Sequence, residues 1–234
     1  MGIAKVQAVP QGSTTSSGTL AVTATVTAGH GLILLIGGHI SSGSLTVSGV
    51  SDTHNTWAHW TAAQKQQGVA LGDIWYCKNV TTGGALTITI TYSAACGAVA
   101  TLIEVSGQDT ATFIDQVVAG SAASGTAMDS GAFATGTADP SEFVIGLAVG
   151  IVGNTFSAQA FSPSLTGQAQ ETLASATAAG IKASLQVSDG IAASAGSKED
   201  FTATLSATGV WIAICASFLP VAAAAPNSGF LAFM

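Results

Sequence analysis

The chain has 234 residues, of which only 7% are charged and 48% hydrophobic, and its mean hydropathy is +0.53. This length can bury a substantial core, and so apolar a composition excludes a charged disordered chain and a coiled coil. All five basic residues are lysines and the formal net charge is −7, so the composition excludes nucleic acids and anionic membrane surfaces as direct partners.

Residues 1–18 are polar and rich in Gln, Ser, Thr and Gly, and we expect them to form an extended N-terminal arm. They lack the basic segment followed by an unbroken apolar stretch that a secretory signal requires. Val6 stands where an N-myristoylation motif has Ser or Thr. The sequence therefore predicts neither export nor lipid anchoring by this segment.

Apolar and polar residues alternate with a period of two along almost the whole chain, which predicts an all-β fold. In residues 86–91 (LTITIT), Leu and Ile alternate with Thr, a pattern typical of half-buried antiparallel strands. Clusters of Gly, Ser, Asn and Asp separate these segments and favour turns. The predicted strands are, in chain order, 20–27, 32–40, 44–50, 55–61, 69–78, 85–92, 98–106, 113–118, 142–152, 168–177, 181–188, 201–207 and 210–219.

A spacing of about ten residues between strands is typical of a two-sheet antiparallel sandwich or jelly roll. We expect residues 19–220 to form one such sandwich, with 119–141 as a long surface crossover between its two halves. The apolar runs 143–153 and 210–225 are shorter or more interrupted than the roughly 20 residues of a membrane span, and they are interpreted as buried strands. Residues 221–234 are expected to form a C-terminal tail.

Three cysteines, Cys77, Cys96 and Cys215, lie among apolar strand residues, and none is part of a C-x-x-C pair. This setting predicts buried free thiols in a protein made in a reducing cytosol. Gly29-x-Gly31 opens a strand and lacks the third glycine of a dinucleotide fingerprint, while P-loop and G-x-S-x-G motifs are absent. The sequence thus predicts no cofactor.

The densest polar cluster spans residues 52–60 (DTHNTWAHW). Asp52, His54 and His59 suggest a metal site, because imidazole and carboxylate groups suit zinc and similar ions. On a strand, however, His54 and His59 project to opposite faces. The alternative is that Asp52 and Asn55 build a turn by binding backbone amides, with Trp57 or Trp60 entering the core.

Four aromatic residues, Trp57, Trp60, Trp75 and Tyr76, could provide a platform for stacking sugars. Trp57 and Trp60 lie on opposite strand faces, as do Trp75 and Tyr76, so at most one of each pair is free. Trp57 and Trp75 are the candidate platform, and the alternative is that the tryptophans serve as core and interface anchors.

Acidic residues that could act in glycoside hydrolysis are Glu104, Asp115 and Glu142. The sequence does not place two of them at the separation across a cleft that this reaction requires. We therefore interpret Glu104 as an outward or ion-paired strand residue. His30 and His39 flank an apolar strand and are interpreted as strand-end residues. No catalytic or metal-binding residue is predicted.

So few charges on so apolar a chain would leave large neutral patches on a monomer, and such patches mark protein contacts. The C-terminal tip strengthens this expectation, because Pro226 to Gly229 should hold it away from the sandwich. The alternative is that the tail folds back on its own domain. The candidate partner-binding residues of the tip are Phe230, Leu231, Phe233 and Met234.

A resemblance rests on five segments spread over residues 18–220: LAVTATVTAGHGLILLIGGHI, VSGVSDTHNTW, DIWYCKNVTTGGALTITITY, AVATLIEVSGQDTATFID and WIAICASFLP. Their succession resembles jelly-roll β-sandwich domains of tailed-phage virion proteins and related bacterial surface proteins. The resemblance implies a non-enzymatic capsid decoration (cement) protein, assembled in the host cytoplasm and placed on the capsid exterior. It also implies a homo-oligomer, by analogy a trimer, bound to the major capsid protein. The alternative is a carbohydrate-binding module of a fibre or bacterial surface protein.

Overall fold

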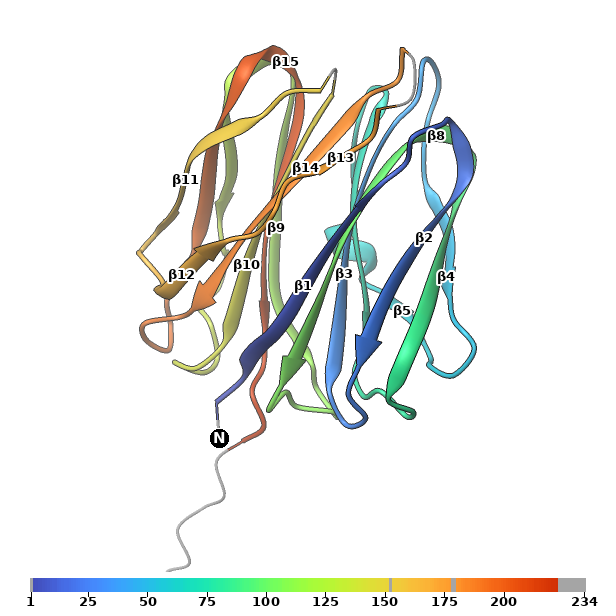
Figure 1. Cartoon of the computed structure of the whole chain (residues 1–234). Coiled ribbons are helices and arrows are strands. Elements are labelled where there is room, and N and C mark those ends of the chain that lie inside the picture. Colours follow the sequence, from blue (N-terminus) through green and yellow to red (C-terminus); the bar gives the residue numbers. More distant parts are fainter. Residues whose placement is uncertain (1, 152, 178–179, 223–234) are drawn as a thin grey trace, which may run out of the picture.

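The computed structural model describes residues 2–151, 153–177 and 180–222 and confirms an all-β fold of two antiparallel sheets packed as a sandwich (Figure 1). The eight-stranded sheet contains β1 (Ala4–Gly12), β2 (Ser17–Val26), β3 (Gly31–His39), β4 (Val47–Ser51), β5 (Ala58–His59), β6 (Lys65–Gln67), β7 (Ala70–Cys77) and β8 (Gly84–Ser106). The seven-stranded sheet contains β9 (Ile114–Ala132), β10 (Phe143–Ile151), β11 (Phe156–Ser162), β12 (Thr166–Gln170), β13 (Ala174–Ser175), β14 (Ala183–Ile191) and β15 (Asp200–Phe218).

The long strands β8 and β15 each take part in two layers. The first half of β8 pairs with β2 and β4, whereas its second half pairs with β1 and β3. One apolar cluster fills the space between the two sheets and includes Ile33, Leu35, Leu147, Leu185 and Ile214. Two further clusters lie on the outward side of β3 and of β10, beneath the outer layers. The predicted strands 85–92 and 98–106 are therefore one bent strand.

Two predicted segments are wrong. Residues 4–12 of the expected arm form β1, which pairs with β8, and residues 119–132 of the expected surface crossover belong to β9, which pairs along β15. β1 was missed, and β9 was predicted only at its start, as 113–118, because most of β1 and the first half of β9 are half-buried and show no clear alternation of buried and exposed residues. The chain is therefore part of the sheet from Ala4 onward, through the pairing of β1 with β8.

The strand order reveals an internal duplication that the sequence analysis missed. In the first sheet the strand order is β1-β8-β3-β7-β5, and β2 and β4 also pair with β8. In the second sheet the corresponding order is β9-β15-β10-β14-β12, and β11 also pairs with β15. The long strand β9 replaces the pair β1 and β2. We call the two halves repeat 1 (residues 2–109) and repeat 2 (110–222).

One turn has the same hydrogen bonds in both repeats. In residues 27–30 the amide of His30 donates to the carbonyl of Thr27 at 3.3 Å, and in 139–142 the amide of Glu142 donates to that of Asp139 at 3.4 Å. The turn's first amide then donates 2.8 Å to a buried carboxylate, Glu104 in repeat 1 and Glu142 in repeat 2. The acid therefore comes from β8 in repeat 1 but from the turn itself, just before β10, in repeat 2.

The repeats pack against each other through reciprocal contacts. β14 contacts β8 and β3, while its counterpart β7 contacts β15 and β10; β1 contacts β13, and β9 contacts β6. The amide of Thr177 donates to the carbonyl of Ser13 at 2.9 Å, and the hydroxyl of Ser121 donates to Gln67 at 3.0 Å. Such exchange of equivalent surfaces defines an isologous, two-fold-like interface within one chain.

Candidate functional site

The loop 52–57 is organised around a single carboxylate. Asp52 Oδ1 accepts hydrogen bonds of 2.7 Å from the amides of His54 and Asn55, and its Oδ2 accepts one of 2.7 Å from the indole N–H of Trp57. These bonds outweigh the effect of burial and lower the pKa of Asp52. Asn55 Oδ1 in turn accepts from the amide of Thr81 at 3.0 Å. The turn-building role predicted for Asp52 and Asn55 is confirmed.

A second carboxylate fixes the adjacent strands β5 and β7. Asp73 is fully buried, and it accepts hydrogen bonds from His59 Nε2 at 2.9 Å and from the indole N–H of Trp75 at 3.1 Å. The rings of His59 and Trp75 stack, with centroids 4.7 Å apart. Burial raises the pKa of Asp73 despite these donors. Among the described residues, no group of three His, Cys, Asp or Glu side chains is arranged to hold a metal ion.

The four aromatic residues divide between the faces as the strand pattern predicts. Trp60 and Tyr76 are buried in the cluster between the sheets, where Trp60 meets Phe218 edge-on at 5.5 Å. Trp57 and Trp75 are half-buried and pack against the outer cluster of repeat 1. Both indole N–H groups are bound by carboxylates, so only the ring faces and edges remain for a ligand.

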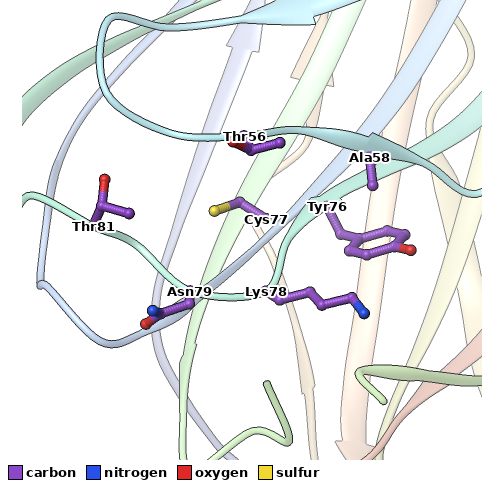
Figure 2. Close-up of a pocket in the computed structure, with 7 residues that line it drawn as sticks. All are labelled: Thr56, Ala58, Tyr76, Cys77, Lys78, Asn79 and Thr81. Atoms are coloured by element: carbon purple, nitrogen blue, oxygen red, sulfur yellow. The ribbon is translucent and has the colours of Figure 1, made fainter. Parts of the chain in front are cut away.

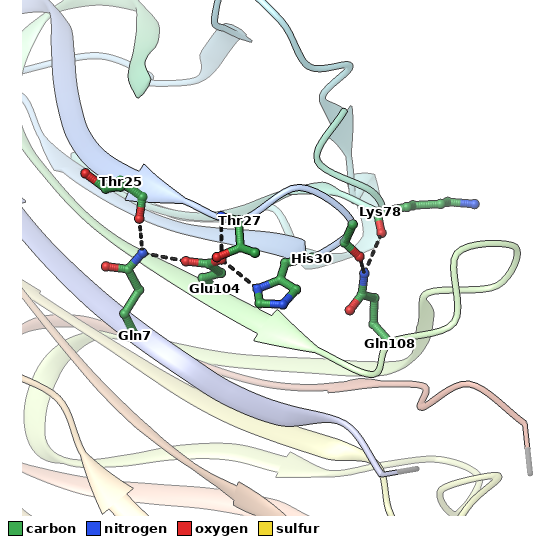
Figure 3. A network of polar contacts seen from close by, with 8 residues as sticks. Gln7, Thr25, Thr27, His30, Lys78, Glu104 and Gln108 are labelled. Carbon is green, nitrogen blue, oxygen red and sulfur yellow. Dashed lines mark hydrogen bonds and ion pairs between the residues drawn. The ribbon is translucent and has the colours of Figure 1, made fainter. Parts of the chain in front are cut away.

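Glu104 lies at the centre of a polar network that joins four segments (Figure 3). It is 1% exposed, and it accepts hydrogen bonds from Gln7 of β1, from the amide of Thr27 and, at 2.7 Å, from His30 Nδ1. Burial opposes the charged form, but these donors outweigh it and lower the pKa of Glu104. Of the two alternatives expected for Glu104, the outward position is wrong, because the carboxylate is buried and its hydrogen-bond partners include His30.

Of the three acidic candidates, the structure brings Asp115 and Glu142 together. They accept hydrogen bonds from consecutive amides, Ala138 to Asp115 at 3.1 Å and Asp139 to Glu142 at 2.8 Å. Burial, with the nearby Asp115 carboxylate, raises the pKa of Glu142 to about 7, although Ser217 and the Asp139 amide favour the charged form. Glu142 is fully buried, so its carboxyl group cannot meet a polymeric substrate at the surface.

Two further carboxylates, Glu171 and Asp189, join the two repeats through Lys5. Lys5 of β1 forms ion pairs with Glu171 and, at 2.9 Å, with Asp189 of β14. Burial raises the pKa of Asp189 to about 7; Glu171 acts in the same direction, and Lys5 opposes it. His39 adds another link, because its Nδ1 donates to the carbonyl of Lys182 at 3.0 Å. No sequence pattern pointed to these long-range pairs.

A pocket of about 350 Å³ lies between loop 52–58 and residues 77–81 of repeat 1 (Figure 2). Ala58, Tyr76 and Cys77 provide its apolar wall, and Thr56 and Thr81 provide hydroxyl groups. We call it the repeat 1 pocket. Its volume falls at the small end of the range for ligand pockets. The aromatic cluster in the sequence gave no indication of it, because two separate loops form it.

An equivalent pocket of about 310 Å³ occurs in repeat 2. The pairing of Ala58 with Tyr76 in repeat 1 corresponds to that of Ala169 with Asp189 in repeat 2. In repeat 2 the N-terminal residues Ile3, Ala4 and Lys5 line the pocket as well. The lining of the repeat 1 pocket, in contrast, comes entirely from residues 56–81.

All three cysteines are buried free thiols, as predicted. Burial raises the pKa of Cys96 to about 12 and also raises the pKa values of Cys77 and Cys215. Thiolate chemistry at neutral pH is therefore disfavoured. The predicted partner-binding tip at 230–234 lies outside the described residues.

The described residues contain no helix long and apolar enough to cross a bilayer. Comparison of the chain with family models, with curated proteins and with solved structures finds no match. The described chain is thus a sandwich of two similar repeats whose buried polar groups stabilise turns and the contacts between the repeats, with a pocket in each repeat and two half-buried indole rings in repeat 1.

Proposed function

We propose that the protein is a non-enzymatic structural component of a tailed-phage virion, a decoration protein that oligomerises and stabilises the capsid shell by docking on the major capsid protein. The resemblance of its strand and turn succession to such domains motivates this proposal. The observation that carries it is the outer layer of repeat 1, formed by β2, β4 and residues 84–92, which contains no charged residue.

This outer layer presents small neutral side chains to solvent. Thr19, Ala21 and Thr23 of β2 are exposed, as are Thr87 and Thr91 of β8. Charged residues are depleted in the centres of protein interfaces, because each buried charge must be desolvated. β2 and β4 pair only with β8 and carry neither Lys nor Pro, the residues that commonly protect free strand edges. We call this surface the neutral face.

The charge of the chain is distributed to match a docked repeat 1 and a solvated repeat 2. Residues 1–109 contain three lysines and four carboxylates, whereas residues 110–234 contain two lysines and eight carboxylates. The outer layer of repeat 2 carries the interacting pair Asp129 and Asp200. Burial is the main cause that raises the pKa of Asp200, and the nearby Asp129 carboxylate raises it further. The acidic repeat would therefore remain in water while the neutral face meets the shell.

The test is occupancy on purified particles. We expect the chain on the capsid exterior in symmetry-related copies, and Thr23→Lys with Thr87→Lys, which face each other across β2 and β8, should reduce its occupancy at least tenfold. Thr126→Lys, at the equivalent start of the outer strand in repeat 2, should leave occupancy unchanged. Absence of the chain from particles, or full occupancy of the paired lysine variant, would refute the proposal.

Carbohydrate binding is the second candidate, and the two half-buried indoles favour it. Asp52 and Asp73 hold the N–H groups of Trp57 and Trp75, so the rings are fixed on the outer side of the β5–β7 edge. Fixed aromatic rings of this kind can stack against sugars. If host polysaccharide retains the protein and Trp57→Ala or Trp75→Ala abolishes retention without loss of fold, the binding module is the correct assignment.

A further inference from the structure

We propose that the repeat 1 pocket is the docking site for the C-terminal tip, residues 230–234, of a neighbouring copy of this chain. The inference rests on the proposed function, since it names the contact by which that oligomer is held together. It is argued from the pocket, from the place where the described chain ends, and from the composition of the segment that follows.

The pocket matches the tip in size and chemistry. A volume of about 350 Å³ with a wall of Ala58, Tyr76 and Cys77 suits one or two apolar side chains. The hydroxyl group of Thr56 at the same pocket can bind the backbone of an extended segment, whereas the hydroxyl of Thr81 donates to the carbonyl of His54 at 2.8 Å and can only accept. The sequence after Ala222, AAAPNSGFLAFM, contains no charged side chain and ends in Phe, Leu and Met residues.

The chain ends at the same end of the molecule as the pocket. The amide of Val221 donates to the carbonyl of Gly107 at 2.8 Å, and the next residue, Gln108, donates from Nε2 to the carbonyl of Lys78 at 3.1 Å (Figure 3). Lys78 also lines the pocket. From Ala222 to Phe230 the chain covers eight residues, an extended reach of roughly 26 Å, enough to bridge to a neighbour packed against this end.

The last described residues run along the 107–113 segment and leave the sandwich at its surface. Leu219 accepts a hydrogen bond from the amide of Asp109, and Val221 then donates to the carbonyl of Gly107. Val221 is 46% exposed, so the chain is at the surface at the point where the tail begins. A tail that begins at the surface is available to the pocket of a neighbouring copy.

A tail in a neighbour's pocket is a heterologous contact, in which each copy uses two different surfaces. Repeated heterologous contacts close into a ring when the rotation between copies permits it. The proposed homotrimer is such a ring, in which every tip and every repeat 1 pocket is used once. The equivalent pocket in repeat 2 has a different lining, which includes the charged residues Lys5 and Asp189, and it suits an apolar tip less well.

The experiment measures the mass of the full-length chain in solution by light scattering, with circular dichroism as a check of folding. A tip variant carries Phe230→Ser and Phe233→Ser. A pocket variant carries Thr56→Trp, with Thr81→Trp as a second version, because both threonines are exposed and line the pocket. Thr166→Trp, at an exposed threonine of the equivalent repeat 2 pocket, is the matched control.

We expect the wild type and the control to form a closed oligomer, and the tip and pocket variants to dissociate at least tenfold more readily, about the effect of losing one buried aromatic side chain. An equimolar mixture of the tip and pocket variants should form a one-to-one complex, because one supplies an intact pocket and the other an intact tip.

Three outcomes would overturn the inference: a monomeric wild type, variants that keep the wild-type mass, or a mixture that forms no complex. A monomeric wild type whose pocket gains solvent access in the tip variant would assign the tail to its own chain. Because the light-scattering assay uses no phage particles, a negative result would overturn only the tail contact, and the occupancy experiment would still decide the virion role. Conversely, a pocket-dependent oligomer that is absent from particles would retain this inference and remove the virion role.

Discussion

Replacing Lys5 by Met should destabilise the protein more at pH 8 than at pH 5. The substitution keeps most of the apolar stem of Lys5 and removes the cation that pairs with both Glu171 and Asp189, whose side chains are 14% and 4% exposed. Breaking a buried ion pair by removing one partner costs about 3–5 kcal/mol. Lys5 is itself 25% exposed, and Asp189, with a pKa of about 7, can escape the unpaired charge by binding a proton.

These two effects reduce the expected loss to about 2 kcal/mol at pH 8: protonating a carboxyl group of pKa about 7 there costs about 1.4 kcal/mol, and the cost is lower still once Lys5, which lowers the pKa of Asp189, is removed. At pH 5 the Asp189 carboxyl is already protonated, so the loss should fall below about 1 kcal/mol. Urea unfolding at the two pH values measures both quantities. Asp189→Asn in the same chain should suppress most of the pH 8 loss. An equal loss at both pH values, or no suppression, would refute this account of the seam.

Three further outcomes follow from the buried carboxylates and glycines. Glu142 has a raised native pKa, so its contribution to stability is complete below the unfolded value near 4 and is lost as pH rises through about 7; Glu142 should account for a fall in the free energy of unfolding on the order of 2 kcal/mol between pH 5 and 8, in addition to that of Asp189, and Glu142→Gln should reduce the measured slope by this amount in urea titrations. Asp52→Ala removes the acceptor of four donors and should cost about 2–3 kcal/mol by thermal or chemical unfolding, whereas a loss below about 0.5 kcal/mol would show that the loop holds without it. A Cβ on Gly146 would lie 2.1 Å from the ring of Phe201, so Gly146→Ala should cost about 1–3 kcal/mol, while Gly49→Ala, which meets no neighbouring atom within 4 Å, should change stability by less than about 0.5 kcal/mol.

The strands could be predicted where one face of a strand is buried and the other is exposed to solvent. In residues 86–91 this produces strict alternation, because Leu86, Ile88 and Ile90 enter the outer cluster while two of the three threonines are fully exposed. The same rule fails for β9, whose first nine residues are all half-buried against β15. Small residues on both faces leave no periodic signal.

The role of Asp52 could be predicted because an aspartate binds amides two and three residues further on, a purely local property. The pairing of Lys5 with Asp189 could not, since the two residues are 184 positions apart and depend on the packing of the repeats. The sequence shows little of the repeat beyond the tripeptide Ser-Gly-Thr at 17–19 and at 124–126, near the start of each outer strand segment, which is too short to indicate a repeat by itself. A search for internal repeats would have been needed to give it weight.

The covalent link between the repeats changes what evolution and engineering can do with their shared interface. In a homodimer of identical halves, every substitution appears twice, so an acid placed on one side of the axis is also placed on the other. Here Lys5 meets Glu171 and Asp189 on one side, while the equivalent pairing on the other side brings Tyr76 against Phe113 at 5.7 Å. Joining the halves also makes their association independent of concentration. One repeat can therefore lose charge while its partner accumulates it, with no penalty in assembly of the pair.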